Sequence, residues 1–166
     1  DSTYRNWNGT RGWDFYSEDA VPCDTGDYVA GTSSSSWHGT HVAGTIAALT
    51  NNNKGVSGIA PGATLIYERV LGPGGGYTTD ISDAILWASG VRITDRIYYG
   101  RNFNPPTLRQ KANVINLSLG GVSACESFMQ SAITTARANG TMVVVAAGNS
   151  SADASTSEPA NCTGSY

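Results

Sequence analysis

The sequence predicts an α/β fold, with a doubly wound, three-layer arrangement around a mostly parallel sheet. Strand and helix patterns alternate from residue 38 onward with short connections, which is typical of α/β layer structures. The run from Met142 to Ala147 is continuously apolar, as in strands that are buried on both faces of a parallel sheet. With 166 residues and no visible internal repeat, a single domain is the natural count.

The first expected elements follow a loop-like stretch over residues 1–37. A helix is predicted over residues 38–49 and a strand over Leu65–Leu71, followed by a glycine-rich loop over residues 72–76. The next helix, over Asp80–Ala88, has apolar residues at i, i+3, i+4 and i+7. These are Ile81, Ala84, Ile85 and Ala88.

The later elements begin after residues 91–112, a polar segment that we expect to be a surface loop because it contains Pro105-Pro106. A strand is predicted over Val114–Leu119. The pattern Ser123-x-x-Glu126 is a capping-box signature for a further helix. One face of that helix would carry Phe128, Ala132, Ile133 and Ala136. Asn139-Gly140 would end it with a left-handed residue.

The composition excludes several functional classes. Hydrophobic residues make up 40% of the chain and charged residues 14%, as in globular proteins. The apolar run at residues 142–147 is far too short to span a membrane. A formal net charge of -3 gives no overall electrostatic footprint for nucleic acid. We therefore expect neither a nucleic-acid partner nor a membrane partner.

His38 is the candidate general base. It stands at the start of a helix rich in small residues, including Gly39, Ala43 and Gly44, although each glycine costs about 1 kcal/mol relative to alanine. Such a helix is useful if neighbouring backbone approaches it closely and holds His38 rigidly. An imidazole has an ordinary pKa of about 6.5 and exchanges protons near neutral pH. For His41, one turn further along, we expect a buried, hydrogen-bonded histidine.

The predicted strands end in glycine and polar residues, where ligands bind in open parallel sheets. The three segments are Gly72–Gly76, Ser118–Gly121 and Ala147–Asn149. Glycine leaves backbone N–H and C=O groups uncovered, so an extended peptide could pair with them; alternatively, the glycines only turn the chain. Asn149 is a candidate amide donor to an oxyanion, or else a turn residue or glycosylation acceptor.

Four motifs in the same order resemble the subtilisin-like serine proteases, the subtilases, and most closely their secreted bacterial branch. They lie at His38–Thr45, Gly55–Pro61, Asn116–Gly121 and Val143–Asn149, within a resemblance that extends from Arg11 to Cys162. The resemblance implies a subtilisin-like fold and a monomeric serine endopeptidase that hydrolyses extracellular proteins. It implies that His38 is the triad histidine and Asn149 the oxyanion donor. The implied substrate-binding residues are Gly75, Gly76, Ser118, Leu119, Gly120, Ala147 and Gly148.

Two catalytic parts of the family pattern are missing. The nucleophile motif Gly-Thr-Ser-Met-Ala does not occur in the 166 residues. Asp24-Thr25-Gly26 imitates the aspartate motif, but no apolar strand precedes it and it lies only 14 residues before His38. Asp14 lacks the motif, and Asp1 lacks a preceding strand. We therefore expect an internal fragment, truncated at both ends and inactive by itself.

The resemblance also implies a structural calcium site and a disulfide. Residues 49–56 resemble a calcium loop, with Asn52 binding through its side chain. The carbonyl ligands would be those of Leu49, Lys54 and Val56. An Asn-rich connecting loop needs no metal, however. The implied disulfide joins Cys125 to Cys162 and leaves Cys23 without a partner; alternatively, all three cysteines are free, buried thiols.

Two other functional classes are open from the sequence. His38 and His41 could belong to a metal-dependent hydrolase, but they are spaced i, i+3 and no glutamate separates them, unlike His-Glu-x-x-His. A non-catalytic, degenerate protease or peptide-binding module would keep the groove and lack the nucleophile. The coding sequence that flanks this chain would separate these alternatives.

Overall fold

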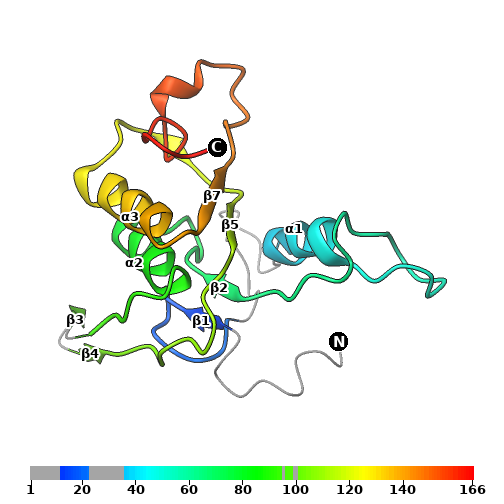
Figure 1. The fold of residues 1–166 in the computed structure, drawn as a ribbon. Helices are drawn as coiled ribbons and strands as arrows, with labels where there is room; N and C mark the ends of the chain where they lie inside the picture. Colours follow the sequence, from blue (N-terminus) through cyan, green and yellow to red (C-terminus); the bar gives the residue numbers. More distant parts are fainter. Residues whose placement is uncertain (1–11, 23–35, 95, 99–100) are drawn as a thin grey trace. The chain divides into compact units, whose positions relative to one another are not determined.

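The computed structural model describes residues 12–22, 36–94, 96–98 and 101–166 (Figure 1). The chain divides into two compact units, residues 1–76 and 77–166, and each is considered by itself. The expected α/β class is confirmed, because helices alternate with strands that pair in parallel in both units. None of the described helices has the length and apolar character needed to cross a membrane.

The first unit contains a parallel pair of short strands, β1 (Gly12–Asp14) and β2 (Tyr67–Arg69). Gly12 pairs with Tyr67 and Asp14 with Arg69. The expectation of a loop over residues 1–37 is therefore wrong at β1, and β2 is shorter than the predicted strand. A strand of three residues is too short to show an alternating pattern, and β1 acquires its hydrogen bonds from a distant segment.

Helix α1 (His38–Ala47) is capped by the chain that follows it. The N–H groups of residues 58–60 donate to the carbonyl oxygens of Ala48, Thr45 and Ile46 at 3.0, 3.0 and 2.7 Å. These bonds satisfy carbonyls at the end of the helix, which have no partner within it. A side chain at Gly58 would collide with the backbone of Ala48, so glycine is needed for this return.

Two expectations about α1 are wrong. Close approach of backbone occurs at Gly58, whereas a Cβ at Gly44 would meet nothing within 4 Å. His41 is exposed, and α1 has no buried residue. In the described part of the first unit, the hydrogen bonds from residues 58–60 to this helix reach only Thr45, Ile46 and Ala48 at its end. Within the described part of the first unit, no other element therefore buries the apolar side chains of α1.

The second unit packs α2 (Thr78–Ala88) against α3 (Ser127–Ala138), and α3 against β7 (Met142–Val145). Strand β7 pairs in parallel with β5 (Val114–Leu117), with Val114 opposite Met142 and Leu117 opposite Val145. In Figure 1 the two helices lie side by side on one side of this strand pair. The largest fully buried side chains in this core are Trp87, Ile85, Met129, Ile133 and Val143.

The apolar run at residues 142–147 predicted a strand buried on both faces, and this prediction is wrong for the strand at residues 142–145. Val143 is fully buried, whereas Met142 is 48% exposed. On β5, Ile115 is buried and Val114 is 54% exposed. Within the second unit, the helices cover one face of the pair, so the strands show one buried face each.

The start of α3 also differs from the prediction. Glu126, not Ser123, is the N-cap residue, and its side chain makes no capping bond. The buried carboxylate of Glu158 accepts the backbone N–H of Glu126 at 2.7 Å, which holds the chain extended until Ser127. The register shifts accordingly, so Met129 is buried and Phe128 is 39% exposed. The expected stop is confirmed, because Gly140 follows α3 with φ +78.

Two antiparallel strand pairs were not expected. β3 (Arg96–Tyr98) pairs with β4 (Arg101–Phe103) inside the segment that we predicted to be a loop. β6 (Gly121–Val122) pairs with β8 (Ser157–Glu158), which follows the short helix η2 (Ala154–Thr156). These strands have two or three residues and no apolar alternation, so a sequence pattern gives no signal for them.

Replacing Ile133 by alanine should destabilise the second unit. Ile133 is fully buried on α3, and truncating such a side chain removes buried apolar surface and leaves a cavity. We expect the free energy of unfolding to fall by about 2–5 kcal/mol in urea denaturation. Thr134→Ala, at the exposed next position, should change it by less than about 0.5 kcal/mol. Equal effects of the two variants would contradict the described core.

Candidate active site

His38 is the first residue of α1 and is exposed. Trp37 precedes it at the N-cap position with a left-handed backbone, φ 54. The backbone N–H of His38 donates to Ser36 Oγ at 3.2 Å. The helix start and this bond fix the backbone, while the imidazole is accessible. Such a side chain can exchange a proton with a group that is brought to it.

The described residues do not support a histidine metal centre. Among them, the only group of three potential ligands drawn from His, Cys, Asp and Glu is Cys125, Glu158 and Cys162. It contains neither histidine, and its two sulfur atoms are joined in a disulfide. A metal-dependent hydrolase built on His38 and His41 therefore lacks further ligands in the described part of the chain.

Two of the predicted peptide-binding segments lie next to each other in the second unit. They follow β5 and β7, whose parallel register continues in a 3.0 Å bond from Ala146 N–H to the Leu117 carbonyl. Gly120 is exposed, and Ser118 and Leu119 are half-buried. Ala147, Gly148 and Asn149 are exposed beyond the neighbouring strand. Both segments therefore stand at one edge, as expected for the carboxyl ends of parallel strands.

Glycine is needed at two positions of this edge. A Cβ at Gly120 would lie 2.9 Å from the Glu158 carbonyl oxygen, and Gly148 has φ +94. Ser157 lies between the segments, because its Oγ is 3.5 Å and 3.7 Å from where a Cβ would stand at Gly120 and Gly148. Ser157 carries no sequence signal, since it belongs to no motif and reaches the edge only through the pairing of β6 with β8.

In the first unit, the glycine-rich segment forms a tight turn. Gly72 and Gly75 exchange backbone hydrogen bonds of 2.8 and 3.1 Å, and Gly74 and Gly75 have φ +86 and +122. These glycines therefore turn the chain, which was the alternative to a binding role. Both backbone groups of Gly75 are used in the turn, so a peptide would pair with its neighbours or open it. Substrate binding by Gly75 and Gly76 stays a prediction.

Asn149 is exposed and follows β7 in the second unit, whereas His38 belongs to the first. Their convergence on one reactive point stays a prediction, as does the oxyanion role of Asn149. Cys23, Asp24-Thr25-Gly26 and Asp1 lie outside the described residues.

Comparisons with known proteins identify the family. A model described as "Subtilase family" matches residues 14–166. The chain belongs to the subtilase family. An "Extracellular protease" of Xanthomonas campestris is 46% identical over 95% of this chain and 29% of that protein. The "Extracellular basic protease" of Dichelobacter nodosus is 44% identical over 77% of the chain and 20% of that protein.

Solved structures agree with this family and its fold. A protease from Pseudoalteromonas arctica has a TM-score of 0.80 and 45% identity, and covers 92% of this chain and 47% of that one. A cold-adapted subtilisin-like serine proteinase has a TM-score of 0.57 and 27% identity, over 95% and 47% of the two chains. The chain thus spans under half the length of these relatives.

A buried ion pair in this subtilase chain was missed by the sequence analysis. Asp14 is 2% exposed, and Arg69 Nη1 donates to its Oδ2 at 2.7 Å. Asp14 Oδ1 accepts the N–H groups of Tyr16 and Ser17 at 2.9 and 2.7 Å. The carboxylate is thus committed to holding β1, β2 and the following turn together. The charged residues Glu68-Arg69 at the end of β2 were the available signal. The partner of Arg69, however, lies 55 residues away in the sequence.

The proposed calcium loop of the subtilase offers neutral oxygen ligands. Asn51, Asn53 and Gly55 have φ of 58, 55 and 57, and Asn52 Oδ1 accepts the Lys54 N–H at 3.0 Å. Calcium accepts carbonyl and amide oxygens, and Oδ1 keeps a second lone pair. Residues 49–56 contain no carboxylate, so these residues fit the neutral part of a site. Binding by Leu49, Asn52, Lys54 and Val56 stays a prediction.

The disulfide between Cys125 and Cys162 is present, with Cα atoms 5.2 Å apart. This is the pairing that the resemblance implied, and these two cysteines are not free thiols. Glu158 is 4% exposed beside the bridge. Its carboxylate accepts from the Glu126 N–H at 2.7 Å and from the Ser123 hydroxyl at 3.4 Å. The bridge and this carboxylate together fix the chain between the end of β5 and α3.

Breaking the Asp14–Arg69 pair should destabilise the first unit. Replacing Arg69 by Met would leave a buried carboxylate without its charge partner, at a cost of about 3–5 kcal/mol. The double variant with Asp14→Asn should cost less than the sum of the single changes, because no unpaired charge then remains. Urea denaturation of the four proteins measures this coupling. Additive effects would show that the pair contributes nothing.

The stability of the first unit should fall with rising pH because of Glu68. Burial raises the pKa of the Glu68 carboxyl well above its usual range. A group with a raised folded pKa holds its proton more tightly in the folded state. Its contribution is complete below the unfolded pKa and is lost as the pH rises through the folded pKa.

Glu68→Gln tests this, because the neutral amide does not titrate. The free energy of unfolding of the variant should rise relative to that of the wild type as the pH is raised from about 4, near the ordinary pKa of glutamate, to about 8. Glu126→Gln, at an exposed position, should leave that slope in place. A constant difference between wild type and Glu68→Gln across the pH range would contradict the prediction.

Proposed function

We propose that this chain is part of an extracellular subtilisin-like serine endopeptidase, and that it supplies the general base and one peptide-binding edge. The observation that carries the proposal is the edge formed by the carboxyl ends of β5 and β7. Two glycine-containing segments stand there side by side with accessible backbone. Membership of the subtilase family supports peptide-bond hydrolysis as the reaction of a substrate bound at this edge.

In the proposed reaction, His38 takes the proton of a serine hydroxyl as that oxygen attacks a peptide carbonyl. It then returns the proton to the leaving amine. The exposed imidazole at the start of α1 suits this role, because it is reachable while its backbone is fixed. The serine and the triad aspartate are not supplied by a family motif within these 166 residues.

Asn149 is proposed to stabilise the negative oxygen of the tetrahedral intermediate through its side-chain amide. It follows a strand whose pairing fixes the preceding backbone. A preorganised donor of this kind acts without reorganising water. The peptide substrate would lie extended along Ser118–Gly120, and the backbone of Ala147 and Gly148 would line the neighbouring subsite.

Two further features support an extracellular setting. The relatives from Xanthomonas campestris and Dichelobacter nodosus are named extracellular proteases. The Cys125–Cys162 disulfide is typical of an oxidising compartment. We also propose that residues 49–56 contribute carbonyl and amide ligands to a structural calcium ion, whose charge would be balanced by residues outside that loop.

The second candidate function is a non-catalytic, peptide-binding module. It is favoured by one observation, which is that the 166 residues contain no Gly-Thr-Ser-Met-Ala motif. Such a module would keep the β5–β7 edge and bind peptides without cleaving them.

Variants of the complete enzyme test the proposed catalytic roles. His38→Ala should lower kcat on a peptide substrate by about 10⁶-fold and Asn149→Ala by roughly 10²–10³-fold, with KM little changed. These magnitudes were measured on a subtilisin, so they are family figures. His41→Ala, at the other exposed histidine of α1, is the matched control and should retain activity.

The 166-residue chain incubated with casein should show no turnover that a sulfonyl fluoride abolishes. Robust inhibitor-sensitive activity of this chain would contradict the assignment of the nucleophile to a motif that it lacks. Full activity of His38→Ala in the complete enzyme would contradict the proposed base.

A further inference from the structure

The basic residues of the chain are concentrated between α2 and β5. Residues 92–111 contain five of the ten lysines and arginines but only one of the thirteen acidic residues. This stretch carries a net charge of +4, so the remainder of a chain with net charge -3 carries -7. We call it the basic stretch, defined by Arg92, Arg96, Arg101, Arg109 and Lys111.

The base of the basic stretch is fixed to the helices of the second unit. Trp87 on α2 is 1% exposed, and its Nε1 donates to the Pro106 carbonyl at 2.7 Å. Ala112 N–H donates to the Ala88 carbonyl at 2.8 Å. The ammonium of Lys111 donates to the Asn139 carbonyl at the end of α3. The stretch is therefore presented from an ordered base.

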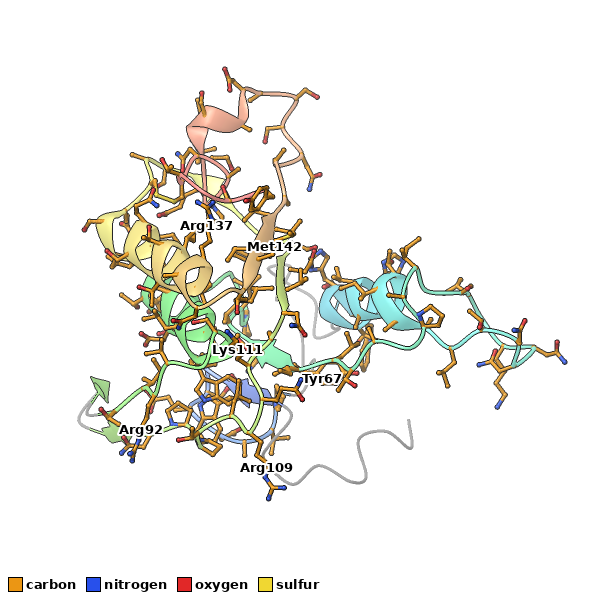
Figure 2. All side chains as sticks on the ribbon, in the orientation of Figure 1. Tyr67, Arg92, Arg109, Lys111, Arg137 and Met142 are labelled. Atoms are coloured by element: carbon orange, nitrogen blue, oxygen red, sulfur yellow. A yellow bond between two sulfur atoms is a disulfide. The ribbon has the colours of Figure 1, made fainter. Side chains whose placement is uncertain are left out.

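Its flanking cations are directed to solvent. Arg92 and Arg109 are exposed, and their side chains point away from α2 and α3 in Figure 2. The ion pair that the structure shows between described residues joins Asp14 to Arg69 and involves neither of these arginines. Arg92 and Arg109 thus present their charge at exposed positions.

The strand pair in the basic stretch has two distinct faces. Arg96 pairs with Phe103, and Tyr98 pairs with Arg101. Paired residues share a face, and residues two apart on one strand share it as well. Positions 96, 98, 101 and 103 therefore lie on one face, and the sequence has arginine or an aromatic residue at each.

The edges of this pair are open to a further strand. β3 and β4 form a sheet of two strands, and no third strand of the described residues pairs with them. Outer edges of this kind present backbone N–H and C=O groups that an extended polypeptide can match by strand addition.

The basic stretch is separate from the peptide-binding edge. It precedes β5, whereas Ser118–Gly120 follows β5. The two surfaces therefore stand at opposite ends of that strand, and a ligand on one leaves the other accessible.

We propose that the basic stretch is an exosite for an extended, acidic polypeptide segment. Guanidinium groups match carboxylates in geometry and charge, and the open strand edges match a peptide backbone. The net charge of -7 on the rest of the chain repels an acidic polymer from other surfaces, so such a polymer would bind preferentially at the basic stretch. In an endopeptidase, such an exosite would select acidic protein substrates; this use rests on the proposed function, whereas the binding does not.

The test is the binding of a fluorescent poly-L-glutamate peptide to the 166-residue chain, followed by anisotropy at low and high salt. We expect saturable binding that weakens with added salt, because salt screens exposed charges. Replacing Arg96 and Arg101 by Gln should weaken it roughly tenfold. Replacing Arg92 and Arg109 by Gln, outside the hairpin, should also weaken it and covers the case in which the hairpin variant misfolds.

Arg137→Gln is the matched control, since it removes an exposed arginine of α3, and it should leave the affinity unchanged. The proposal is overturned if polyglutamate fails to bind, or if neither double variant weakens binding more than Arg137→Gln does. It is also overturned if dextran sulfate or oligothymidylate binds and polyglutamate does not compete. An inactive enzyme that still binds polyglutamate would refute the proposed function and leave the exosite intact.

Discussion

The backbone hydrogen bonds between β5 and β7 determine where the second unit can present reactive groups. Because the strands are parallel and in register from Val114–Met142 to Leu117–Val145, their carboxyl ends finish at one edge. Two segments separated by more than 20 residues in the sequence thereby become neighbours. Helix α3 packs on β7 and α2 packs on α3, with Ile133, Met129 and Trp87 buried in this core.

The loops around that edge are held by polar groups as well as by apolar burial. Glu158 takes the place of a capping side chain, since its carboxylate accepts the N–H that precedes α3. The Cys125–Cys162 bridge closes the same region. In the first unit, Asp14 and Arg69 perform a comparable task for β1 and β2. In each case a buried carboxylate is acceptable because its oxygens receive hydrogen bonds.

Charge is distributed unevenly over a chain whose net charge is small. A net value of -3 excludes a dominant basic surface for the whole chain, yet the stretch between α2 and β5 is strongly basic. Its attachment through Trp87 and Pro106 gives these cations an ordered base. The glycine-containing edge beyond β5 and the basic stretch before it therefore differ in charge and lie at opposite ends of one strand.

The sequence alone determined the α/β class with its parallel strands, the helices α2 and α3, and the family to which the motifs belong. The helices follow from local periodicity, which is strong over ten or more residues, the strands follow from short apolar runs, and the family follows from the four motifs. The implied disulfide came from the resemblance, because cysteine spacing does not define a pairing.

Only the tertiary structure decided the features that depend on distant partners. The start of α3 at Ser127, the burial of Asp14 with Arg69, and the place of Ser157 are set by segments far away in the sequence. The short strands β1, β3 and β4 likewise exist because another strand supplies their hydrogen bonds. A local pattern cannot reveal such features, since the free energy that stabilises them comes from contacts between residues that the sequence does not place together.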